Sequence, residues 1–160
     1  MLGMNEASKW ILQGPYSDPS LIRNALAYEI WRDMGYHAPQ SRFVEVIMNG
    51  VYQGVYLLME RNEISPARLD LHTKSDGSDA FLIQLNRPDR SDVVINAGGM
   101  QFIVDDPPGV MVDSLYLKHI RETMEQFVAA TNDPALNGKD IDWNSWADFF
   151  IMQELSKNPD

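Results

Sequence analysis

The fold is decided by residues 42–60, RFVEVIMNGVYQGVYLLME. Two apolar, β-branched runs flank Asn49-Gly50, the dipeptide best suited to the two positive φ angles of a type I′ turn. The stretch therefore predicts a β-hairpin. If Asn49 and Gly50 occupy the turn, Met48 lies opposite Val51, Val46 opposite Gln53, and Val44 opposite Val55.

The second predicted strand is interrupted by Gly54. A glycine within a strand indicates either a β-bulge or a close backbone approach by a neighbour or ligand. Because one hairpin alone is only marginally stable in water, we expect helices or further strands to cover its apolar sides.

Composition limits the classes of function. The chain has 160 residues, with 23 acidic and 13 basic side chains and a net charge of -10, which argues against nucleic-acid binding. A small anionic ligand can still bind at a few local cations. The chain has no cysteine, and no apolar run long enough to span a bilayer, so we expect no membrane insertion. Residues 1–12 lack the pattern of a signal peptide, so any export signal must lie outside this chain.

The first predicted helix precedes the hairpin. Asp18 is placed to cap it, Pro19 suits its first position, and Gly35 lies just past its end. The stripe Ile22, Leu26 and Ile30 predicts one buried face.

The other elements follow from period and turn signals. We expect strands at residues 9–12, 80–85, 92–96 and 99–104, with a second hairpin at Ala97-Gly98-Gly99 and turns at 75–79 and 105–109. An amphipathic helix is expected at about 113–131. A last helix is expected after Asp142, with Trp143, Trp146, Phe149, Phe150 and Leu155 on its apolar side. We therefore predict a single α+β domain over residues 1–160, an antiparallel sheet around the central hairpin with flanking helices.

Standard catalytic and metal motifs are absent. His37, His72 and His119 lack metal-ligand spacing. Residues 140–144 resemble the start of a calcium loop but fail at Ser145 and Ile151, where glycine and glutamate are needed. Asp76, Asp79, Asp105 and Asp106 are interpreted first as turn residues.

Two other charged side chains each allow a structural and a functional interpretation. Glu60 is either a surface ion pair or a buried carboxylate facing a cleft. Arg23 is a solvated or ion-paired surface residue unless it binds a ligand. The residue pattern alone does not decide between these alternatives.

The order of several blocks resembles the CotH kinase family. They are WILQGPYSDPSLIRNALA at 10–27, GYHAP at 35–39, FVE at 43–45, NGVYQGVYLLME at 49–60 and FIMQELSKNPD at 150–160. Residues 61–137 match only in general character.

The resemblance implies an atypical, protein-kinase-like fold that binds ATP and Mg²⁺ and phosphorylates protein side chains. Asp160 falls at the family's catalytic-loop aspartate. Glu60, Arg23 and Asn24 match positions that we assign to the nucleotide side of the cleft. No metal ligand is assigned within this chain.

The chain also departs from the family pattern. Members carry an upstream strand with a nucleotide-contacting lysine, which Lys9 does not match, and a downstream Trp-Asp-x-Asp segment that binds metal. We therefore expect an interior portion of a kinase domain that binds ATP and Mg²⁺ poorly alone. We also expect exposed apolar surface that allows self-association.

By resemblance, the intact domain is a kinase acting on Ser or Thr of envelope, coat or secreted proteins. Its expected location is extracytoplasmic, at the cell surface or in the spore coat. The alternative is a noncatalytic surface or coat-assembly binding module.

Overall fold

The structure is a computed structural model that describes residues 2–7, 9–14, 16–71, 80–109, 114–136, 139 and 141–157. The described residues fall into two compact units. The first lies within Met1–Asn62, Ala67–Leu69 and Asn144–Asp160, and the second within Glu63–Pro66 and Asp70–Trp143. Helices and antiparallel sheets occur in separate runs along the chain, so the predicted α+β class is confirmed. Its strands form two sheets, one in each unit.

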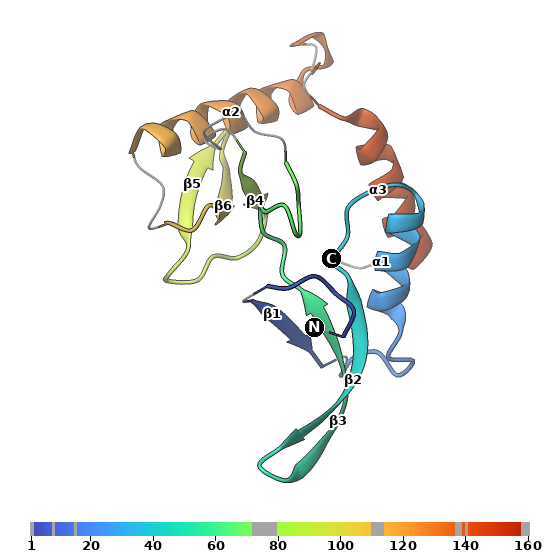
Figure 1. The fold of residues 1–160 in the computed structure, drawn as a ribbon. Helices are drawn as coiled ribbons and strands as arrows, with labels where there is room; N and C mark the ends of the chain where they lie inside the picture. The colour runs from blue at the N-terminus through green and yellow to red at the C-terminus, as the bar shows by residue number, and fades with distance from the viewer. Residues whose placement is uncertain are drawn as a thin grey trace. The chain divides into compact units, whose positions relative to one another are not determined.

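The first unit holds a three-stranded sheet, with β1 at Trp10–Gln13, β2 at Ser41–Met48 and β3 at Val51–Glu60. The strand order is β1-β3-β2 and both pairings are antiparallel. β1 pairs only with Leu57–Glu60, so the part of the hairpin nearer its turn is a two-stranded ribbon (Figure 1).

The hairpin turn is the one predicted. Asn49 and Gly50 have φ values of 51° and 78°, and Met48 lies opposite Val51. The other two predicted pairs are wrong by one residue, because a bulge shifts the register between Val46 and Ile47. Val46 lies opposite Gly54, not Gln53.

In the same way, Val44 lies opposite Tyr56, not Val55. Gly54 causes the shift, since its φ of 107° is open mainly to glycine. A Cβ built at Gly54 would meet no atom within 4 Å, so this glycine serves the bulge and not a close approach.

The ribbon beyond β1 keeps its apolar side chains exposed. Ile47 is 69% exposed and Val51 60%, whereas Leu57 is 2% exposed where β1 flanks β3. The cover expected for the hairpin therefore reaches only the end of β3 that β1 pairs with.

Helix α1 spans Arg23–Asp33 and starts four residues later than Pro19, the predicted first position. The reason is Leu21, whose φ of 63° breaks the helical path between Asp18 and Arg23. The carboxylate of Asp18 nevertheless accepts the Arg23 N–H at 2.9 Å, so it satisfies a helix-start donor from outside the helix.

The end of α1 is as predicted. Gly35 has a φ of 93° and donates its N–H to the carbonyl of Arg32, while Tyr36 donates to that of Trp31. These two bonds form a Schellman motif. The Trp31 and Tyr36 rings stack at 4.2 Å, which supplies the hydrophobic contact that accompanies such an end.

Helix α3 spans Trp143–Ser156 and begins directly after Asp142, as predicted. The buried face predicted for α1 is not formed, and the apolar side predicted for α3 is largely exposed. Leu26 is 53% and Phe150 65% exposed, and Met152 is the buried residue among those described in α3. The two helices meet where Trp31, outside the predicted stripe of α1, contacts Phe149 on the predicted apolar side of α3 edge to face.

The second unit holds β4 at Leu82–Gln84, β5 at Val93–Ala97 and β6 at Met100–Asp106, in the order β4-β6-β5. Helix α2, Ser114–Asn132, packs on this sheet, and a short 3-10 turn, η2, follows at Pro134–Leu136. These elements confirm the predicted strands, second hairpin and amphipathic helix.

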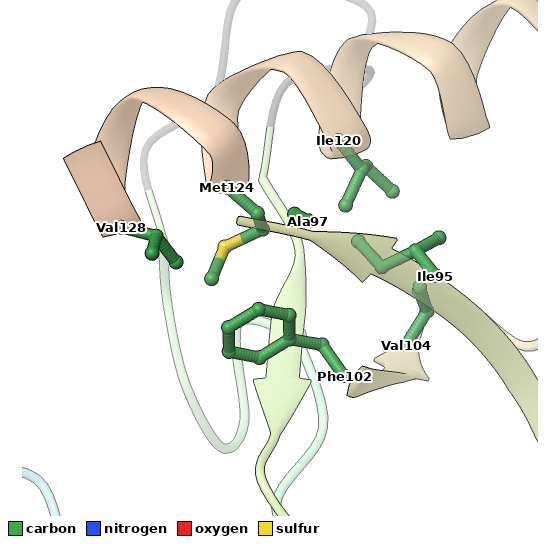
Figure 2. Close-up of a cluster of buried hydrophobic side chains, with 7 residues drawn as sticks. All are labelled: Ile95, Ala97, Phe102, Val104, Ile120, Met124 and Val128. Atoms are coloured by element: carbon green, nitrogen blue, oxygen red, sulfur yellow. The ribbon is translucent and has the colours of Figure 1, made fainter. Parts of the chain in front are cut away.

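The core of this unit lies between α2 and the sheet (Figure 2). Its buried members come from one face of α2 and from β5 and β6: Ile95, Ala97, Phe102, Val104, Ile120, Met124 and Val128. Ile120 is fully buried. The predicted apolar stripe of the helix is therefore the one that packs.

The turn was predicted to begin at residue 105, but the strand before it continues to Asp106. β6 runs through Asp105 to Asp106, and the Asp106 carboxylate accepts the Ile64 N–H at 2.8 Å. Asp106 thus has a structural partner inside its own unit. The turn expected at 75–79, with Asp76 and Asp79, and also His72 and Asp140, lie outside the described residues.

The turn between β5 and β6 generates a stability prediction. Gly98 and Gly99 both have positive φ, but a Cβ on Gly98 would lie 2.4 Å from Val128 Cγ1, whereas one on Gly99 meets nothing within 4 Å. We expect Gly99→Ala to lower the free energy of unfolding by about 1 kcal/mol, the cost of backbone strain.

Gly98→Ala should cost about 1–3 kcal/mol more than its neighbour, since it also overpacks the contact with α2. Urea unfolding of the two variants measures the difference. Equal losses would mean that the close approach of the turn to Val128 does not constrain the fold.

Candidate functional site

A pocket of about 380 Å³ lies between α1 and α3 in the first unit; we call it the α1–α3 pocket. Arg23 and Asn24 reach it from the first turn of α1, and Lys157 reaches it from just past the end of α3. The remaining lining residues are Ala27, Tyr28, Trp31, Phe149, Met152, Gln153 and Ser156. The pocket therefore combines two cations with aromatic walls.

Aromatic contacts hold the two helices on either side of the pocket. Trp31 stacks on Tyr36 and meets Phe149 at 6.2 Å with an interplanar angle of 81°. The Tyr36 hydroxyl donates to the Asp148 carboxylate at 2.6 Å. Burial raises the pKa of Tyr28 above its ordinary value of 10.0, so this phenol stays neutral and can donate a hydrogen bond at physiological pH.

Arg23 is largely exposed and ion-paired, as in the first of the two alternatives given for it above. Its Nε lies 3.5 Å from Asp18 Oδ1, and 76% of its side chain is exposed. The Asp18 carboxylate also accepts the Ser20 hydroxyl at 2.6 Å and the Ser20 N–H at 3.0 Å. The Ser20 hydroxyl and the Arg23 N–H hold the pKa of Asp18 below its ordinary value of 3.8.

Glu60 is a buried carboxylate, with 5% of its side chain exposed, and it faces Arg68. Its Oε2 accepts the Gln40 N–H at 3.0 Å, and its own N–H donates to the Gln40 carbonyl. Glu60 Oε1 lies 3.9 Å from Arg68 Nε. Glu60 does not line the α1–α3 pocket, so the structure does not bring it to Arg23 and Asn24.

Arg68 is the residue that sequence reasoning missed. Only 1% of its side chain is exposed, and it donates to the carbonyls of Arg61 at 2.9 Å and Lys9 at 3.2 Å. Its guanidinium also lies 4.7 Å from the ring centroid of Trp10, which pairs across the strands with Glu60. The sequence signal was weak, because Arg68 lies in a loop with no periodic pattern.

Arg68 Nε and Glu60 Oε1 each lack a hydrogen-bond partner, although both are buried. At 3.9 Å they form an ion pair without a hydrogen bond. Each charge of the pair therefore compensates the other, and removing either residue would leave an uncompensated buried charge.

Asp160, the predicted catalytic residue, lies outside the described residues, three positions after Lys157. The described part of the chain has no cluster of three or more His, Asp or Glu side chains placed to hold a metal ion. Among the described helices, none is both long and apolar enough to cross a membrane.

The fold and the pocket define an α+β protein whose candidate site suits an anionic ligand that carries a ring. Comparison with protein families identifies it further. The family model described as CotH kinase protein matches residues 1–160, so the chain belongs to that family.

Among curated proteins, the chain is similar to the inner spore coat protein H of Bacillus subtilis (strain 168), with 43% identity over 49 residues. That match covers 31% of this chain and 14% of the relative. No solved structure matches the chain.

The buried pair generates a second prediction. Arg68→Met keeps much of the side-chain volume but leaves Glu60 buried without a counter-charge, which typically costs about 3–5 kcal/mol of stability. The double variant Arg68→Met with Glu60→Gln should recover part of that loss, because it removes the unpaired charge. Urea unfolding measures both, with Arg87→Met on an exposed loop as the matched control. A loss no greater than that of the control would contradict the assigned role of the pair.

Asp18 generates a third prediction. Because its pKa is lowered in the folded state, its contribution to stability is present above the unfolded pKa of about 3.9 and is lost as the pH falls through the folded pKa. We expect Asp18→Asn to flatten the dependence of stability on pH below about pH 4.

Ser20→Ala should move the pKa of Asp18 part of the way back toward 3.8, because the Ser20 hydroxyl is the largest cause of the shift. NMR titration of the Asp18 carboxyl carbon reads this directly. An unchanged pKa in Ser20→Ala would show that the hydroxyl bond is not the cause.

Proposed function

We propose that this chain is part of an ATP-dependent protein kinase that transfers phosphate to Ser or Thr of a coat, envelope or secreted protein. Membership of the CotH kinase protein family supports the class. The observation that carries the site is the α1–α3 pocket, which brings Arg23 and Asn24 together with Lys157, three positions before Asp160.

The chemistry of the pocket fits the parts of ATP. Arg23 and Lys157 supply positive charge for phosphate oxygens, and Arg retains donors beyond the Nε that faces Asp18. Trp31, Tyr28 and Phe149 supply flat apolar surface of the kind on which a purine stacks. Asn24 adds a neutral donor and acceptor beside Arg23.

In the proposed reaction, the oxygen of a protein hydroxyl forms a bond to the γ-phosphorus of ATP while the bond to the ADP oxygen breaks. The hydroxyl proton passes to the carboxylate that we assign to Asp160, which also orients the nucleophile. Glu60 stays assigned to the nucleotide side by resemblance alone, because it pairs with Arg68 and does not line the α1–α3 pocket. Mg²⁺ neutralises phosphate charge in such reactions, and no described residue is assigned to it.

A second candidate is a noncatalytic binding module in a spore coat or at a cell surface. The similarity to an inner spore coat protein and the exposed apolar residues of the hairpin and of α3 favour it. Exposed apolar surface of this kind is typical of protein contacts, including self-association.

The fourth prediction tests the kinase proposal in the full-length protein. We expect Arg23→Met or Lys157→Met to weaken Mg·ATP binding by about threefold to tenfold each, since each removes a charged contact at an open pocket. Arg121→Met, on an exposed position of α2, is the matched control. Isothermal titration measures the affinities.

Asp160→Asn should keep Mg·ATP binding but lower phosphate transfer by about 100-fold or more, because the general base is lost. Undiminished transfer would exclude a catalytic role for Asp160. If Mg·ATP fails to raise the melting temperature of the full-length protein, the binding module is the better description.

A further inference from the structure

A second cavity lies entirely within the second unit, and the proposed kinase function does not use it. It occupies about 580 Å³ between α2, β4, Leu136 of η2 and Ile141; we call it the α2 cavity. That volume is within the range of small-molecule sites. Phe81 and Ile83 form one side of the cavity, and Phe127 of α2 forms another.

Helix α2 has two stripes of side chains, one toward the core and one toward the cavity. Ile120, Met124 and Val128 point into the core between helix and sheet (Figure 2). Thr123, Phe127 and Ala130 recur at a spacing of four and three residues and line the cavity, which Met124 also borders. Because Ala130 has a single methyl group, the second stripe leaves space that a larger side chain would fill.

The described lining residues carry no charge. All the described residues around the cavity have neutral side chains, although the whole chain has a net charge of -10. Among the described lining residues an anion would find no counter-charge and a cation no partner, and the net negative charge of the chain would also repel an anion. The cavity therefore suits an uncharged molecule.

Two neutral polar side chains could form hydrogen bonds that orient a ligand in the cavity. The Thr123 hydroxyl donates to the His119 carbonyl at 3.0 Å, which leaves its oxygen free to accept a hydrogen bond. Gln126 adds an amide that can donate or accept. The Phe81 and Phe127 rings offer faces and edges to a further ring.

We propose that the α2 cavity is a binding site for a small, uncharged aromatic molecule with one hydrogen-bonding group. Phe81, Ile83 and Phe127 also pack against the buried core, so an occupant touches side chains that support the fold of the unit. Binding to the native state must then raise its stability.

The test compares four probes of similar shape, namely benzyl alcohol, toluene, benzoate and benzylamine. Full-length protein labelled with ¹³C at alanine methyl groups is titrated by NMR, which follows Ala129 and Ala130 at the cavity directly. Benzyl alcohol should shift these methyl signals with a Kd of about 1 mM, as expected for a ligand of this size. Benzoate and benzylamine should bind about tenfold more weakly.

Ala130→Leu should abolish the Ala129 shift by filling the cavity, whereas Ala147→Leu, at an exposed position of α3, should leave it unchanged. Thr123→Val keeps the space but removes the acceptor, so it should erase the preference for benzyl alcohol over toluene even if Ala130→Leu fails to fold. The proposal is overturned if saturating benzyl alcohol leaves both methyl signals unmoved, if benzoate binds equally well, or if Thr123→Val keeps the preference.

Discussion

The first unit depends on one buried guanidinium. Arg68 joins backbone carbonyls at the start of β1 and after the end of β3, covers the Trp10 ring and compensates the Glu60 carboxylate. Glu60 in turn is bonded to Gln40 just before β2. A single planar cation with several fixed donors thus links the ends of all three strands, a task that the flexible point charge of lysine would perform poorly.

Local signals predicted most of the elements. Asn49-Gly50 set its turn and Gly35 ended α1, because each supplies the positive φ that its position requires. Asp142 marked the start of α3 for another reason, because aspartate is a favoured residue just before a helix. The predicted strand register failed although Gly54 had been noted as a possible bulge, because that bulge shifts every pair beyond it by one residue.

These local signals could not predict which helix faces and which distant residues pack together. The period of Ile22, Leu26 and Ile30 predicted the buried face of α1, yet Ile22 and Leu26 are exposed and α1 meets α3 through the ring of Trp31. Arg23 and Asn24, which were singled out from the sequence, line one pocket, but the presence of Lys157 there and the separate position of Glu60 follow from packing between distant segments. Arg68 shows the same limit, because a loop arginine carries no sign of its burial.

The bare ribbon of the hairpin has a consequence for motion. Where β1 flanks β3, backbone amides are shielded by a neighbour on each side, while toward Asn49 the two strands have only one another. Opening at the tip exposes little new apolar area, so it costs little free energy. The ribbon should therefore show a gradient of amide exchange, slow at Leu57 and fast near the turn, with two timescales along one continuous pair of strands.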